Sequence, residues 1–199
     1  MNRREASLLL SLTAAVGLAR PARAETSEEA VARVNELGGL ALEVAQNDER
    51  MDVSFRGVDK LEDADLAVLA DLGEIAYLRL GDTPIGDDAL DHVAPLTSLV
   101  KLSLEKTHIT DAGLAKLKDL ENLEYLNIYG AEVSDAGLEH LAGLKNLKKL
   151  YVWQTHVTDE GAEKLREALP DLDIDQGWEL PEETGEEDAE EAEESPESN

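Results

Sequence analysis

Apolar residues recur every 24 positions along the middle of this 199-residue chain. One offset, for example, carries Leu78, Leu102, Leu126 and Leu150. The recurrence divides the chain into five blocks, of which the middle three align without a gap: 51–75, 76–99, 100–123, 124–147 and 148–172. A fixed period of about 20–50 residues is typical of solenoids, in which stacked units share one hydrophobic core. We therefore expect a repeat architecture.

Each block changes its hydrophobic period halfway, and this change predicts two elements per unit. Residues 102–104 alternate between apolar and polar side chains, as in a strand. Thr110 then offers a hydroxyl cap, Asp111 places an acid in the first helical turn, and apolar residues recur every three positions as far as Leu120. One short strand and one short helix per unit predict an α/β fold with parallel strands and right-handed crossovers.

The pattern L-x-L-x-x-T-x-I-T-D-A-G-L-x-x-L from Leu102 to Leu117 resembles that of bacterial leucine-rich repeat proteins. It is most similar to the 24-residue T-D-x-G-L subtype, which also occurs in ribonuclease-inhibitor-like proteins. The resemblance implies a leucine-rich repeat solenoid, a short horseshoe with parallel strands on its concave side and helices on its convex side. After the strand, many members have Asn or Cys, whereas this chain has Thr83, Thr107, Ala131 and Thr155. Since Ala131 has no hydroxyl, the solvation of the fourth turn is in question.

Both ends of the repeat array have features of caps. In residues 25–50, Ser27 is expected to cap a helix that Gly38-Gly39 ends, and two strands are expected around a turn at Asn47-Asp48. Alternating acidic and apolar residues over 171–175 predict a final cap strand, and 51–174 is assigned to the five repeats and this cap. Residues 175–199 contain twelve acids and no Lys or Arg, which predicts a disordered acidic tail.

Residues 1–24 have the pattern of an export signal peptide. Arg3 and Arg4 precede an apolar run of about 14 residues, and Ala22-Arg23-Ala24 fits a cleavage site with small residues at its first and third positions. Such a run is shorter than the roughly 20 residues of a membrane span. We therefore expect a periplasmic or secreted protein whose mature chain has no transmembrane anchor. The arginine pair leaves the general and twin-arginine routes open, and a retained amphipathic helix is the alternative interpretation.

Composition excludes several kinds of chemistry. The formal net charge of -27 disfavours nucleic acid and anionic membranes as partners. The absence of Cys excludes disulfides, thiolate zinc sites and thiol nucleophiles. His108 and His156 share an offset two units apart, which favours exposed loop residues over metal ligands. No catalytic motif is present, so we expect neither an enzyme nor a cofactor.

On the concave side of the predicted horseshoe, each strand offers three positions between or beside its inward apolar residues. Five of the seven aromatic residues fall on these positions, where basic residues also outnumber acidic ones. Tyr, Trp and Arg dominate binding hot spots, because they bury large rigid surfaces and keep a polar group. The sequence therefore predicts a partner-binding surface made of Tyr77, Arg79, Lys101, Tyr125, Asn127, Tyr129, Lys149, Tyr151 and Trp153.

Together these features predict an exported, non-enzymatic binding protein that recognises a protein or peptide. One alternative is an envelope-associated structural protein that binds polysaccharide or peptidoglycan by stacking sugar rings on Tyr129 and Trp153. A second, which the repeat subtype suggests, is a substrate adaptor of the ubiquitin-ligase type if the chain is not exported. Two narrower alternatives concern the concave side itself: its aromatic residues only stabilise the strands, or the acidic tail folds over them.

Overall fold

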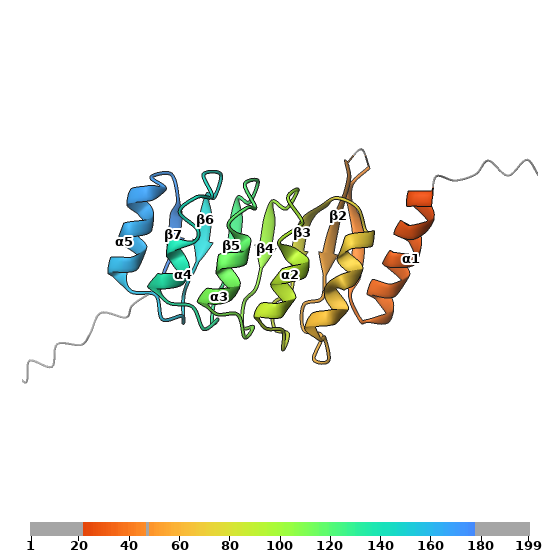
Figure 1. Cartoon of the computed structure of the whole chain (residues 1–199), viewed down its shortest axis with the longest axis horizontal. Coiled ribbons are helices and arrows are strands. Elements are labelled where there is room, and N and C mark those ends of the chain that lie inside the picture. The colour runs from red at the N-terminus through yellow and green to blue at the C-terminus, as the bar shows by residue number, and fades with distance from the viewer. Residues whose placement is uncertain (1–21, 47, 178–199) are drawn as a thin grey trace, which may run out of the picture.

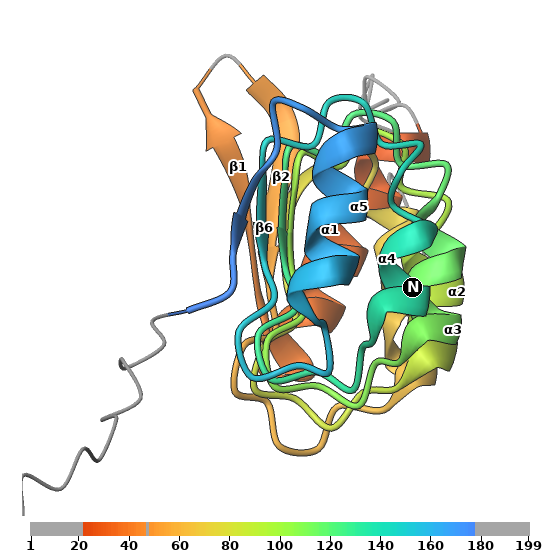
Figure 2. The ribbon, with the colours of Figure 1, turned by 90° about the vertical axis from the view of Figure 1, so that its left-hand side faces the viewer.

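The computed structural model describes residues 22–46 and 48–177, with side chains from Glu28 onward, and they form two layers (Figures 1 and 2). The strands are β1 (Leu40–Ala45), β2 (Asp48–Ser54), β3 (Ile75–Arg79), β4 (Lys101–Ser103), β5 (Tyr125–Asn127), β6 (Lys149–Tyr151) and β7 (Asp173–Asp175). They form one seven-stranded sheet in sequence order, in which β1 and β2 are antiparallel and the others parallel. Figure 2 shows the helices on one face of this sheet only.

The helical layer is built from short elements. They are α1 (Ala22–Glu36), η1 (Asp63–Asp71), η2 (Asp87–Ala89), α2 (Leu90–Val93), α3 (Asp111–Leu114), η3 (Ala115–Leu117), α4 (Asp135–Glu139) and α5 (Asp159–Ala168). The three η elements are 3-10 helices, so the first unit contains no α-helix of its own. In the three middle units the helical segments make only one or two turns, and short 3-10 segments suit such connections.

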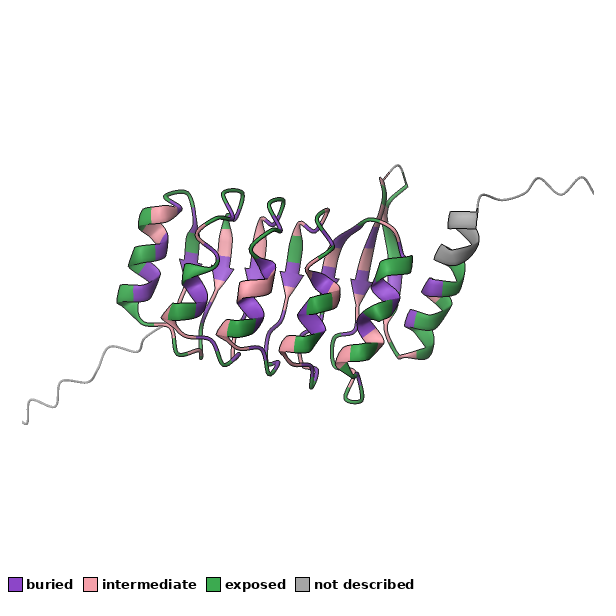
Figure 3. Ribbon diagram, viewed as in Figure 1, coloured by how far each residue is buried: buried purple, intermediate pink, exposed green. Residues whose placement is uncertain are grey.

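The predicted α/β solenoid of strand–helix units is confirmed. Leu78, Leu102, Leu126, Leu150 and Ile174 pair successively across β3 to β7, and each is buried. Buried positions recur from unit to unit along both layers (Figure 3). Parallel pairing between identical offsets therefore produces one continuous core, which no single unit could bury alone.

The start of the first helix and the start of the acidic tail differ from the prediction. α1 begins at Ala22, so Ser27 lies inside the helix instead of capping it, because the preceding Ala, Arg and Glu residues also favour helix. β7 includes Asp175, the first residue of the predicted tail, whose carbonyl accepts the Val152 backbone N–H at 2.9 Å. Most of the predicted export signal, Asn47 and the tail from position 178 lie outside the described residues.

The turn at Ala131 keeps its hydrogen bonding without a hydroxyl. In the unit before it, the Thr107 hydroxyl donates to the Leu104 carbonyl at 2.7 Å. At the same place in the next unit, the Ala131 backbone N–H donates to the Ile128 carbonyl at 3.0 Å. Ala131 is buried, and this backbone bond gives the Ile128 carbonyl the donor that a threonine hydroxyl provides in the unit before.

Carboxylate bonds join each unit to the next where the helices begin. Asp87 accepts the backbone N–H of Thr110 at 2.8 Å and its hydroxyl at 2.7 Å. The Thr110 hydroxyl also caps its own helix by accepting the Ala112 N–H at 3.2 Å. The same two carboxylate bonds recur in the next two units, between Asp111 and Ser134 and between Asp135 and Thr158. We call this series the aspartate ladder; the acid expected to complement the helix dipole also binds the next unit.

Glycine makes room for the aspartate ladder. A β-carbon on Gly137 would overlap Oδ1 of Asp111 and would lie 2.9 Å from Cγ1 of Val133. Equivalent overlaps occur at two further positions, Gly113 with Asp87 and Gly161 with Asp135. The glycine of the T-D-x-G-L pattern is therefore required by close approach between units, not by the conformation of its own backbone.

Gly137→Ala should lower the free energy of unfolding by about 1–3 kcal/mol, because the added methyl group displaces the Asp111 carboxylate. Urea unfolding followed by circular dichroism measures the change. Gly143→Ala is the matched control, since a β-carbon there meets no heavy atom within 4 Å. Equal losses in the two variants would contradict the proposed role of Gly137.

The aspartate ladder should also make stability depend on pH. The backbone N–H and hydroxyl of Thr158 lower the pKa of Asp135 below its ordinary 3.8, so its charged form stabilises the fold above that pH. Asp135→Asn should therefore lower the melting temperature at pH 7. The difference from the unmodified chain should shrink as the pH falls from 3.8 through the lower pKa of the folded carboxyl.

Asp171→Asn is the control for this measurement. Asp171 is exposed and has no hydrogen bond or ion pair among the described residues. Its replacement should leave the melting temperature nearly unchanged at every pH. A deficit of Asp135→Asn that stays constant down to pH 2 would show that the carboxylate charge does not carry the effect.

Candidate functional site: the open face of the sheet

One side of the sheet is not covered by helices (Figure 2). We call the side chains on this side the open sheet face. Strand register arranges them in three rows. The first row is Asp52, Tyr77, Lys101, Tyr125, Lys149 and Asp173, and the second is Ser54, Arg79, Ser103, Asn127, Tyr151 and Asp175. The third lies just beyond the strands and contains Arg56, Gly81, Glu105, Tyr129 and Trp153. All nine residues predicted to bind a partner lie in these rows.

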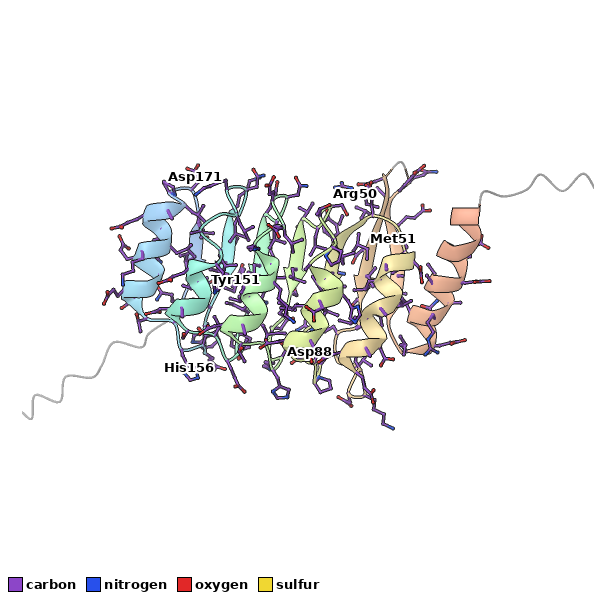
Figure 4. The ribbon with its side chains drawn as sticks, in the orientation of Figure 1. Arg50, Met51, Asp88, Tyr151, His156 and Asp171 are labelled. Atoms are coloured by element: carbon purple, nitrogen blue, oxygen red, sulfur yellow. The ribbon has the colours of Figure 1, made fainter. Side chains whose placement is uncertain are left out.

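Aromatic rings contact one another across neighbouring strands. The Tyr125 and Tyr151 rings lie 5.4 Å apart between centroids and are tilted, and those of Tyr129 and Trp153 lie 5.3 Å apart and are stacked. Figure 4 labels Tyr151 within this part of the sheet. Contacts of this kind are worth about 0.5–1.5 kcal/mol beyond the area they bury. The rings therefore form a rigid, ordered surface.

The third row leaves ring edges free rather than ring faces. Lys106 places its Nζ over the Tyr129 ring at 5.7 Å from the centroid, while Trp153 stacks on that ring from the next unit. Trp153 in turn packs on Gly177, where a β-carbon would overlap its ring atoms. Trp153 is nevertheless 47% exposed. Its free surface is suited to edge contacts with a partner more than to flat stacking.

Most cations of the open sheet face have acidic partners. Arg79 forms a two-fold ion pair with Asp52, and Lys149 lies 2.9 Å from Asp173. Arg56 lies 3.4 Å from a carboxylate oxygen of Glu105. The sequence predicts a basic surplus on this face, but β7 adds Asp173 and Asp175 to it, so four acidic residues balance four basic ones. The exception in the described part of the chain is Lys101, which has no ion pair.

Two titratable groups of the open sheet face have shifted pKa values. Partial burial raises the pKa of Tyr125, with the neighbouring Tyr151 contributing, which keeps the phenol protonated and able to donate. A hydrogen bond to Asp173 raises the pKa of Lys149, which therefore remains a cation. Near neutral pH the Tyr125 phenol is therefore neutral, and Lys149 and Asp173 form a charged pair.

A hollow of about 310 Å³ opens in the face around Lys101. Its lining consists of Tyr77, Leu78, Arg79, Lys101, Ser103 and Tyr125, from β3, β4 and β5. Lys101 places its Nζ over the Tyr77 ring, 5.0 Å from the centroid. The side chain is exposed, so its ammonium group is accessible at the hollow.

β1 extends the open sheet face beyond the predicted residues. Leu40 pairs with Ser54 and Leu42 with Asp52, so both leucines lie on the open side, where they are 52% and 54% exposed. The small Ala41 takes the inward position, because it pairs with the fully buried Val53. The sequence of residues 40–45 predicts a strand. Which of its two sides faces outward depends on the register with β2, which the sequence does not show.

The four histidines do not assemble a metal site. His108 and His156 lie in loops, and Figure 4 places His156 at the edge of the molecule. Nδ1 of His108 is 4.0 Å from the exposed carboxylate of Glu132. Within residues 22–46 and 48–177, no group of three or more His, Asp or Glu side chains could hold a metal ion. No helix in these ranges is long and apolar enough to cross a membrane.

One family model matches part of the observed array of units. Residues 96–118 match a family model described as Leucine Rich repeat, while no curated protein matches the chain. A leucine-rich repeat protein of Leptospira interrogans is 19% identical over 55% of this chain and 27% of its own, with a TM-score of 0.43. An internalin from Listeria monocytogenes is 21% identical over 57% and 38%, with a TM-score of 0.41.

A plant structure covers more of both chains. The leucine-rich repeat ectodomain of the receptor kinase SOBIR1 from Arabidopsis thaliana is 15% identical over 75% of this chain and 90% of its own, with a TM-score of 0.48. By contrast, this chain spans less than half the length of the Leptospira and Listeria structures. The matched repeat lies inside the observed array of strand–helix units, and the chain is a leucine-rich repeat solenoid.

Proposed function

We propose that this chain is a non-enzymatic binding protein that recognises a protein or peptide through its open sheet face. Leucine-rich repeat domains generally serve as protein-binding scaffolds. The observation that carries the proposal is the row of half-exposed Tyr and Trp side chains on this face, from β3 to β6. Such residues dominate binding hot spots.

The order of the rings supports recognition. Tyr125 is held by Tyr151, and Tyr129 by Lys106 and Trp153, before any partner arrives. A surface that is already ordered loses little side-chain entropy on binding, and that entropy otherwise costs about 0.5–1.5 kcal/mol per side chain. More of the contact energy is therefore available for affinity.

A protein partner fits this surface better than a saccharide does. Sugar rings stack on open aromatic faces, whereas the Tyr129 ring already has Trp153 stacked on it and the Lys106 ammonium over it. Trp153 similarly lies between Tyr129 and Gly177. Ring edges, phenol hydroxyls and the exposed Leu40 and Leu42 instead match the mixed apolar and polar character of protein interfaces.

Tyr129→Ala/Trp153→Ala should reduce capture of the native partner at least about tenfold, because truncating hot-spot residues costs about 2 kcal/mol or more. Crosslinking capture from an extract of the native source, quantified by mass spectrometry, measures the loss. His108→Ala/His156→Ala is the control, since it removes two exposed rings from loops outside the rows. Both variants are compared at concentrations where urea unfolding shows equal folded fractions. Unchanged capture by the first variant would mean that the rings only stabilise the strands.

We further propose that the chain is exported, with Glu25 as the first residue of the mature protein. The support is the arginine pair, the short apolar run and the cleavage pattern Ala22-Arg23-Ala24. Amino-terminal sequencing of the protein recovered outside the cytoplasm should begin at Glu25. Recovery of intact Met1 in the cytoplasm would contradict export and favour a retained helix.

A further inference from the structure

The hollow around Lys101 offers one uncompensated positive charge. Asp52 pairs with Arg79 through both of its carboxylate oxygens, so the charges of these two side chains cancel. Lys101 has no such partner among the described residues, and its contact is with the Tyr77 ring. Since the other cations described on this face are paired, the Lys101 ammonium group is the one that remains available to an acidic group of a partner.

The lining of the hollow is suited to an anion with a single charge. The Lys101 ammonium, the Ser103 hydroxyl and the phenols of Tyr77 and Tyr125 can all donate hydrogen bonds. A side-chain carboxylate would match the single charge of Lys101 and accept several of these donors. A dianionic phosphate would meet the nearby Asp52 and the formal net charge of -27 with too little positive charge to compensate.

We propose that this hollow receives the carboxylate of an Asp or Glu side chain from the protein partner. The inference rests on the proposed function and specifies the chemistry of what is bound. A charge-assisted hydrogen bond of this type is worth about 1.5–3 kcal/mol, or roughly tenfold or more in affinity. Lys101 then determines which partner sequences bind, while the aromatic rings supply most of the contact area.

The exposed leucines of β1 add a spacing to this recognition. Leu42, Asp52, Tyr77 and Lys101 occupy successive strands of the sheet, so Leu42 and Lys101 are three strand spacings apart, roughly 14 Å. An extended segment that crosses the strands covers this distance in about four residues. The preferred partner segment therefore carries a large apolar side chain about four positions from its acidic residue.

The test is selection of phage-displayed random 12-residue peptides on the full chain. Peptides enriched on the unmodified chain should share an acidic residue with a large apolar residue about four positions away. Selection on Lys101→Glu should replace the acidic residue with Lys or Arg. Lys118→Glu, which makes the same charge change at an exposed site in the helix layer, should select the same peptides as the unmodified chain.

Affinity measurements on one selected peptide make the assignment quantitative. Lys101→Gln should weaken its binding about tenfold or more, and Lys118→Gln should not. Exchanging the peptide's acidic residue for its amide should weaken binding to the unmodified chain by the same factor. The same exchange should hardly change the affinity for Lys101→Gln. Selected peptides without an acidic position, or peptides bound equally by Lys101→Gln, would overturn the inference and leave the proposed function standing.

Two other results would overturn the inference in distinguishable ways. Enrichment that is equal on Tyr129→Ala/Trp153→Ala, or no enrichment at all, would remove the proposed function as well. The eleven acidic residues of 178–199 are a second source of carboxylates. Changing all of them to amides in the full chain should leave peptide affinity within about twofold, whereas a tenfold gain would assign the hollow to the tail of this chain instead of a partner.

Discussion

The aspartate ladder is the contact on which the arrangement of the units depends. Each carboxylate accepts two bonds from the hydroxyl residue of the following unit, and that hydroxyl also caps its own helix at Thr110, Ser134 and Thr158. One set of atoms therefore starts the helix and sets the distance to the neighbouring unit. Because the glycine at Gly137 and its equivalents admits the carboxylate, the helices stand close enough for the strands to pair without a change of register.

Strand register then decides what the opposite layer presents. Pairing between equal offsets places Tyr77 beside Lys101, and Tyr125 beside Lys149, so side chains of complementary character become neighbours. Their ring contacts and ion pairs leave a face that is nearly neutral within a strongly acidic protein. The proposed recognition on this face therefore relies on aromatic surface and on Lys101, which has no ion pair in the described part of the chain, and not on net charge. The acidity elsewhere discourages polyanionic partners.

The candidate surface could be predicted from sequence to the extent that it follows the repeat. A strand has a period of two, and the repeat fixes which offset faces inward, so Tyr125 and Tyr151 could be assigned to one face before any coordinates. The position of Leu42 on this face could not be predicted in the same way, because β1 lies outside the repeat and pairs in the antiparallel direction. The neutralisation of Arg79 and Lys149 also escaped it, since those ion pairs depend on side-chain reach between units.

The sequence by itself determined the number of units, the alternation of strand and helix and the buried leucines, because each of these is a local pattern repeated at fixed spacing. Tertiary structure alone decided that Asp87, Asp111 and Asp135 bind the next unit and that Lys101 has no ion pair among the described residues. These outcomes depend on distances between residues in different units. Local periodicity predicts which residues share a face of the sheet or helix layer. Which of these residues touch across units depends on how closely the units stack.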